Sequence, residues 1–123
     1  MNKVESHRDL IVWEKSMALT EEVYRLAQRF PQSEMYGLRS QMTRCAVSVA
    51  ANIAEGHVRM GSREFANFLS FARGSLAELD THLELGARLR YLDRTDCAVA
   101  NSLATEVGKM LTTMITNLRR GAP

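Results

Sequence analysis

Apolar residues recur every three or four positions along most of the chain, which brings them to one face of an α-helix. No segment shows the alternation of apolar and polar residues that is typical of a strand. Breaks in the pattern fall at Pro31, at Gly61 and around Asp93, where turn-forming residues interrupt a helix. The pattern therefore predicts helices at residues 9–30, 34–59, 63–92 and 96–119.

The links between these predicted helices are only a few residues long, so each helix must turn back beside the one before it. We therefore predict an all-α protein, an antiparallel up-down-up-down four-helix bundle, as a single domain over residues 1–123. Ser33 and Ser62 are the expected N-caps of the second and third helices. Gly74, in the middle of the third helix, is expected to mark a close approach to the alanine-rich second helix.

The first predicted helix carries two apolar series, although a helix that packs against one core needs only one. One series consists of Leu10, Trp13, Met17, Tyr24 and Ala27, and the other of Val12, Leu19, Val23, Leu26 and Phe30. Two series indicate that the helix faces both its own core and another subunit. Trp13, Met17 and Tyr24 are the candidate subunit interface. Two alternatives stay open: the opposite series forms that interface, or both series form one wide core-facing stripe.

Polar residues follow one ridge of the second predicted helix, beside an apolar ridge that contains Cys45. The third helix carries a matching polar group. We call these residues the polar seam: Ser48, Asn52, Glu55, Arg73, Ser75 and Glu78. We expect the polar seam to be partly buried and hydrogen-bonded between the two helices, because charged groups at a tight crossing must pair. A binding site is the alternative interpretation.

Arginine dominates the basic residues, with 13 Arg among 16 Lys and Arg, although the net charge is only +2. Arginine suits phosphate recognition because its planar guanidinium makes paired hydrogen bonds. The candidate nucleic-acid-binding residues are Arg39, Arg44, Arg59 and Arg63, with Arg88, Arg90 and Arg94 near the other end of the third helix. Arginines that merely solvate helix ends are the alternative.

No catalytic or cofactor motif is evident. Glu78 and His82 are four residues apart, whereas di-iron bundles use paired Glu-x-x-His motifs. Neither Cys45 nor Cys97 has a partner at ligand spacing in the sequence, so we expect buried free thiols and no metal. Without a glycine-rich phosphate loop or an activated nucleophile, we expect no enzyme activity and no cofactor. The chain also lacks an apolar run of membrane-spanning length and a signal peptide, which predicts a cytoplasmic protein.

Three stretches together resemble a known family. They are LIVWEKSMALTEEVYRLAQRFP, YGLRSQMTRCAVSVAANIAEG and FLSFARGSLAELDTHLELGARLRYL. They resemble the small bacterial proteins named for 23S ribosomal RNA intervening sequences, and the resemblance covers about residues 9–118. The pairing of NIAEG (52–56) with ARGSLAEL (72–79) is its most specific part. Cys45 departs from the small aliphatic residue that is usual in the family.

The resemblance implies a four-helix bundle that assembles into a ring-shaped homopentamer. Relatives of the family include the accessory variability determinant of diversity-generating retroelements, a pentamer whose basic surface binds a reverse transcriptase and nucleic acid. We therefore expect a non-enzymatic homopentameric scaffold that binds RNA or DNA through an arginine-rich surface. A protein–protein adaptor without nucleic-acid affinity, for example a reverse-transcriptase accessory protein, is the alternative.

Overall fold

The structure is a computed structural model that describes residues 4–121, and those residues form helices and no strand. The four long helices are α1 (Ile11–Ala27), α2 (Leu38–Val58), α3 (Ser62–Arg88) and α4 (Ala98–Gly121). Two short 3-10 turns, η1 (His7–Asp9) and η2 (Gln32–Glu34), precede α1 and α2. The prediction of an all-helical protein with four helices is confirmed.

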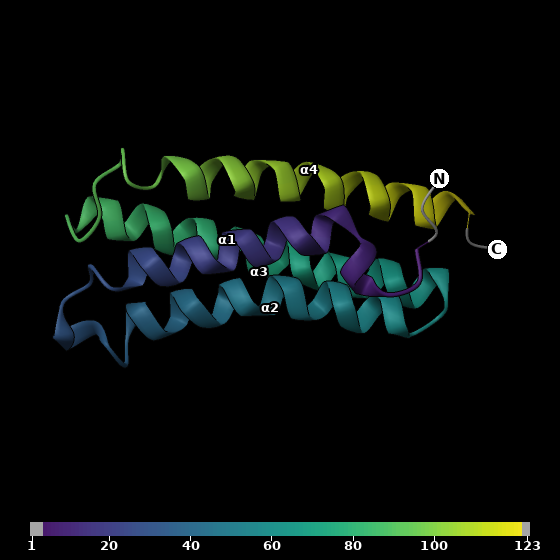
Figure 1. The fold of residues 1–123 in the computed structure, drawn as a ribbon, viewed down its shortest axis with the longest axis horizontal. Coiled ribbons are helices and arrows are strands. Elements are labelled where there is room, and N and C mark those ends of the chain that lie inside the picture. The colour runs from purple at the N-terminus through teal and green to yellow at the C-terminus, as the bar shows by residue number, and fades with distance from the viewer. Residues whose placement is uncertain (1–3, 122–123) are drawn as a thin grey trace.

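The four helices lie side by side with their long axes nearly aligned, and the chain reverses direction at each link (Figure 1). Each helix packs against two others: α2 lies against α1 and α3, and α4 lies against α3 and α1. The arrangement is that of a four-helix bundle with one central core. None of the helices in residues 4–121 is both long enough and apolar enough to cross a membrane.

The core takes its side chains from all four helices, as the periodicity of each helix predicts. In α1 the series that contains Leu19, Val23 and Leu26 is fully buried. Met17 and Tyr24, from the other series of α1, are exposed instead. The rest of that series is not uncovered, because Ala27 is buried and Leu10 and Trp13 are partly buried against the core. Of the three candidate interface residues, the single chain therefore leaves Met17 and Tyr24 exposed and partly covers Trp13.

Helix α2 begins four residues later than the sequence pattern suggests, and its N-cap is Gly37 rather than Ser33. Pro31 starts the 3-10 turn η2, and this turn contains Ser33. The Glu34 carboxylate accepts a hydrogen bond from the backbone N–H of Leu38 at 3.1 Å, so a side chain from η2 satisfies a free amide at the helix start. The predicted cap at Ser62 is wrong by one residue, because Gly61 is the N-cap of α3.

Helices α2 and α3 approach each other closely at Gly56, not at Gly74. A Cβ atom on Gly56 would lie 2.6 Å from the Cβ of Phe68, nearer than two non-bonded carbons can approach. Gly74 is exposed, and a Cβ atom there would meet nothing within 4 Å. The prediction for Gly74 is therefore wrong, because this residue lies on the solvent side of α3.

Candidate functional site

Three residues of the polar seam meet where α2 crosses α3. The hydroxyl oxygens of Ser48 and Ser75 lie 2.9 Å apart, a hydrogen bond between the two helices. The Asn52 amide donates to the Ser48 hydroxyl at 3.0 Å and to the Ser48 backbone carbonyl at 2.9 Å. All three residues are partly buried, so this part of the polar seam joins the two helices.

The charged residues of the polar seam behave differently, since Glu55, Arg73 and Glu78 are all exposed. Glu55 pairs with Arg59 of its own helix, with the carboxylate oxygen 3.0 Å from the guanidinium nitrogen. The expectation that these three residues are at least partly buried is wrong, and Glu55 pairs along its own helix rather than with α3. Within the described residues, Glu78 alone of the three bonds to the other helix, through the Cys45 thiol of α2. All three lie at the outer edge of the helix pair, where water reaches their charges.

The fold brings Cys45 of α2 beside Glu78 and His82 of α3. The Sγ atom, a carboxylate oxygen and an imidazole nitrogen of these residues all lie within 4.8 Å of one another. The expectation that Cys45 has no partner at ligand spacing is therefore wrong. The sequence shows that Glu78 and His82 share a helix face, but only the register between α2 and α3 places Cys45 beside them.

These surroundings also shift the pKa values of Cys45 and Glu78. Burial, together with the neighbouring Glu78 carboxylate, raises the pKa of the Cys45 thiol to about 12. A hydrogen bond from the same thiol lowers the pKa of Glu78. Cys45 and Cys97 are both buried and free, as expected, and burial raises the pKa of Cys97 too. Neither residue is an activated thiolate nucleophile.

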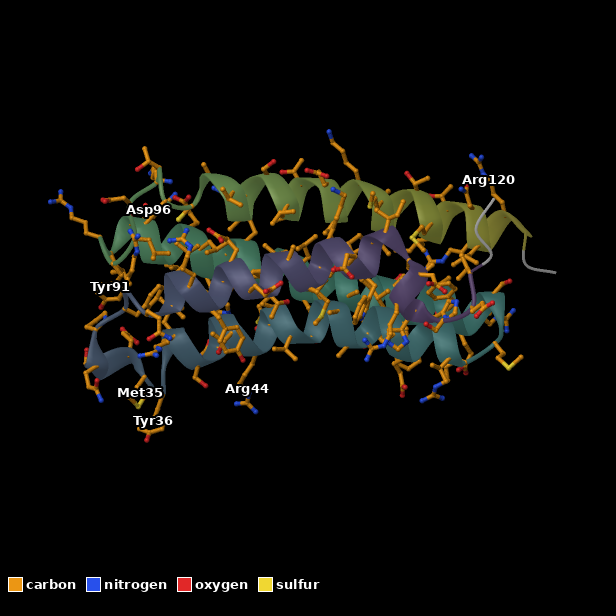
Figure 2. The ribbon with its side chains drawn as sticks, viewed as in Figure 1. Met35, Tyr36, Arg44, Tyr91, Asp96 and Arg120 are labelled. Atoms are coloured by element: carbon orange, nitrogen blue, oxygen red, sulfur yellow. The ribbon has the colours of Figure 1, made fainter. Side chains whose placement is uncertain are left out.

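The four candidate nucleic-acid-binding arginines do not form one patch. Arg44 and Arg59 are 15 residues apart on the same helix, which corresponds to about 22 Å. Arg59 is paired with Glu55 and, at 3.5 Å, with Glu64. Arg44 points away from the bundle (Figure 2).

The other three arginines of the set, unlike Arg59, have no carboxylate partner within residues 4–121. Arg44 and Arg63 form no ion pair within residues 4–121. Arg39 donates to the Gln28 side chain at 3.3 Å. Arg44 and Arg63 therefore keep a charge that no carboxylate of the described chain offsets.

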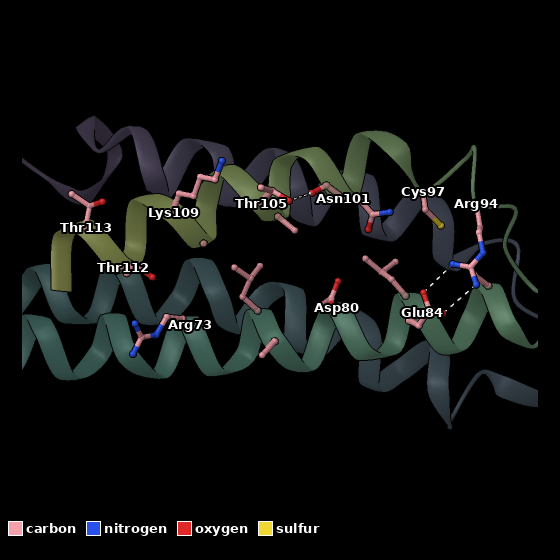
Figure 3. A pocket seen from close by; sticks show the side chains of 16 residues that line it. Arg73, Asp80, Glu84, Arg94, Cys97, Asn101, Thr105, Lys109, Thr112 and Thr113 are labelled. Atoms are coloured by element: carbon pink, nitrogen blue, oxygen red, sulfur yellow. Dashed lines mark hydrogen bonds and ion pairs between the residues drawn. The ribbon is translucent and has the colours of Figure 1, made fainter. Parts of the chain in front are cut away.

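An open groove of about 1000 Å³ runs between α3 and α4, a feature that the sequence pattern did not indicate (Figure 3). Its walls carry both charges, with Arg73 and Asp80 from α3 and Lys109 from α4. At one end Arg94 makes two hydrogen bonds to Glu84, at 2.9 and 3.1 Å. Arg94 and Arg88 together lower the pKa of Glu84 to about 2. The mixed charge gives the groove no clear preference for an anionic ligand.

Comparisons with known proteins agree with this fold. Residues 8–113 match the model of a family described as 23S rRNA-intervening sequence protein. The chain is similar to a crystal structure of a protein of unknown function from the S23 ribosomal protein family of Bacteroides thetaiotaomicron VPI-5482. The two are 26% identical with a TM-score of 0.78, over 85% of this chain and 98% of that chain. A comparison with curated proteins gives no match. With the family match spanning most of the bundle, the chain belongs to the 23S rRNA-intervening sequence protein family.

Proposed function

We propose that the protein assembles into a homopentameric ring and that this ring binds the phosphates of RNA or DNA through exposed arginines, without catalysing a reaction. The observation that carries the proposal is an exposed apolar face over α1 and α2. We call this the α1–α2 face and define it by Met17, Tyr24, Val47 and Val58.

The side chains of the α1–α2 face are between 37% and 63% exposed. Met17 and Tyr24 are seven residues apart, and Val47 and Val58 are eleven apart, so each pair shares one side of its helix. The Thr20 hydroxyl donates to the backbone carbonyl of Ala46 at 3.1 Å and holds the two helices together there. Exposed apolar side chains on two helices that pack together support an interface with another protein chain.

A second exposed apolar pair, Phe71 and Leu85, lies on α3. Two unlike apolar surfaces on one chain suit head-to-tail association, in which one surface of a subunit packs against the other surface of the next. Such association closes into a ring when the rotation between subunits allows it. The number of five subunits comes from the family resemblance.

Nucleic-acid binding is supported by the arginines that lack a carboxylate partner. Arg44 lies one helical turn from Val47, at the edge of the α1–α2 face, and Arg63 lies in the first turn of α3. A net charge of +2 per chain becomes +10 in five copies (5 × 2). Each weak phosphate contact then recurs around the ring, so the contacts reinforce one another. Binding of this kind tolerates many sequences and weakens as the salt concentration rises.

The assembly is tested by light scattering of the purified protein. We expect about five times the chain mass for the wild type, and a smaller species for Tyr24→Asp because a charge would be buried in the interface. Val99→Asp is the matched control, since Val99 is an exposed apolar residue on α4. A wild-type monomer would contradict the proposal, as would equal effects of both substitutions.

Nucleic-acid binding is tested by fluorescence anisotropy with unrelated short RNAs and DNAs over a range of salt concentrations. The double variant Arg44→Ala/Arg63→Ala should bind more weakly, with a shallower dependence of affinity on salt. The double variant Arg25→Ala/Arg88→Ala removes the same charge from arginines that are already paired with glutamates. A wild-type pentamer that binds no nucleic acid at low salt would instead favour a protein–protein adaptor, such as a partner of a reverse transcriptase.

A further inference from the structure

We propose that Cys45, Glu78 and His82 form a binding site for a divalent transition-metal ion of the zinc class, which would join α2 to α3. One potential ligand atom from each residue lies within 4.8 Å of the other two. Glu78 and His82 are four residues apart on α3, so they stand on neighbouring turns of one face, and Cys45 faces them from α2. The site is separate from the α1–α2 face and does not depend on the function proposed above.

The state of His82 points to a ligand. His82 is only 7% exposed, and neither nitrogen of its ring has a hydrogen-bond partner in the described chain. The Nε2 atom lies 3.6 Å from the Glu78 Oε2 atom, which is too far for a hydrogen bond. A buried imidazole without a partner is costly, and a metal ion would satisfy one of its nitrogens.

The distances suit a small tetrahedral ion. Zinc binds nitrogen, oxygen and sulfur ligands at about 2.0–2.3 Å, so its ligand atoms lie roughly 3.3–3.8 Å from one another. The separation of 3.6 Å between His82 and Glu78 already falls in this range. The Glu78 side chain is 61% exposed and free to move toward Cys45. Its exposure also gives the ion an entry path and leaves the fourth position open to water.

The ligand set selects the metal. A thiolate and an imidazole favour Zn²⁺ or Co²⁺, whereas Mg²⁺ and Ca²⁺ prefer oxygen ligands alone. The Cys45 thiol holds its proton in the metal-free protein, because burial raises its pKa. On binding, the S–H bond breaks, the sulfur lone pair forms the bond to the metal ion, and one proton leaves to the solvent. No electron is transferred.

The probe is Co²⁺, followed by absorption spectroscopy of the reduced full-length protein, with the Zn²⁺ stoichiometry measured by calorimetry. We expect one ion per chain and a thiolate-to-cobalt charge-transfer band in the wild type. Cys45→Ala should lose the band. Cys97→Ala is the matched control, because it removes the other buried thiol and should keep the band. Glu78→Gln should weaken Zn²⁺ binding by at least about tenfold.

Two results would overturn the proposal. One is a wild type that gives no charge-transfer band with Co²⁺. The other is a Zn²⁺ affinity that stays unchanged in Glu78→Gln. Because this side chain is exposed, we expect the variant to fold as the wild type does, and circular dichroism checks this. The Glu78→Gln result decides the question even if Cys45→Ala fails to fold.

Discussion

The hydroxyl groups of Ser48 in α2 and Ser75 in α3 meet at 2.9 Å, and they make the hydrogen bond that directly links the two helices within the polar seam. Asn52 donates to the same Ser48 oxygen, so the three side chains act as one network. Networks of this kind fix the register of one helix against another, because a shift by one residue would separate the partners.

Removing either serine hydroxyl should destabilise the protein modestly. We expect Ser75→Ala to lower the free energy of unfolding by about 0.5–1.5 kcal/mol, because the Ser48 hydroxyl loses its partner in α3. Urea denaturation measures the change, with Ser102→Ala on the exposed side of α4 as control. In the double variant Ser48→Ala/Ser75→Ala the two effects should not add. Strict additivity would show that the two hydroxyls do not interact.

Replacing Gly56 of α2 and Gly74 of α3 by alanine should change the free energy of unfolding in opposite directions. Gly56→Ala should lower the free energy of unfolding by about 1–3 kcal/mol, because the new Cβ collides with Phe68. Gly74→Ala should raise it by about 0.4–1 kcal/mol, because that site has open space and the unfolded chain loses freedom. Thermal denaturation of both variants checks this. A stabilising Gly56→Ala would contradict the close approach.

Glu84 should make the stability of the bundle depend on acidic pH. Its pKa falls from 4.5 to about 2 in the folded protein, chiefly through Arg94 and then Arg88. Because the folded protein holds Glu84 ionised at a lower pH than the unfolded chain does, ionised Glu84 stabilises the fold. This stabilisation is present above about pH 4.5, the pKa of the unfolded state, and is lost as the pH falls toward 2, the pKa of the folded state.

The measurement is the difference in urea midpoint between the wild type and Glu84→Gln. The wild type should be more stable at neutral pH, and the difference should disappear by about pH 2. Arg94→Ala, which removes the larger cause of the shift, should flatten this pH dependence. A difference that is constant over the whole pH range would refute the role of Glu84.

Glu55→Ala should leave the melting temperature nearly unchanged. The carboxylate is exposed, and within residues 4–121 its only ion pair is with Arg59, one turn away on α2. Exposed ion pairs within a helix contribute little because water solvates both charges well. A large drop in melting temperature would mean that Glu55 contacts a neighbouring subunit, which light scattering of the same variant would reveal.

The helices were predictable because each carries its own periodic apolar residues, such as Leu19, Val23 and Leu26 in α1. The start of α2 was not predictable from the sequence, because the turn η2 and the Glu34 carboxylate together replace a conventional N-cap side chain. A pattern read along one helix gives the face of each residue, but it does not reveal a cap supplied from four residues earlier.

The candidate sites were less predictable because they depend on register between helices. The sequence placed Ser48 and Ser75 on facing ridges, and the structure brings them together. It did not indicate that Cys45 would lie beside His82, since periodicity leaves the sliding of α2 along α3 undefined. The open groove between α3 and α4 depends on side-chain volumes from both helices and has no signature in either one.

The even number of helices has a practical geometric result. Helix α1 begins and helix α4 finishes at the same end of the molecule (Figure 1). Any polypeptide joined before α1 or after α4 would crowd that end alone. The opposite end, where Tyr36 and Tyr91 lie, would stay clear (Figure 2). A molecule tethered to a surface through either terminus would therefore turn the same end of the bundle toward that surface and the tyrosine end toward the medium.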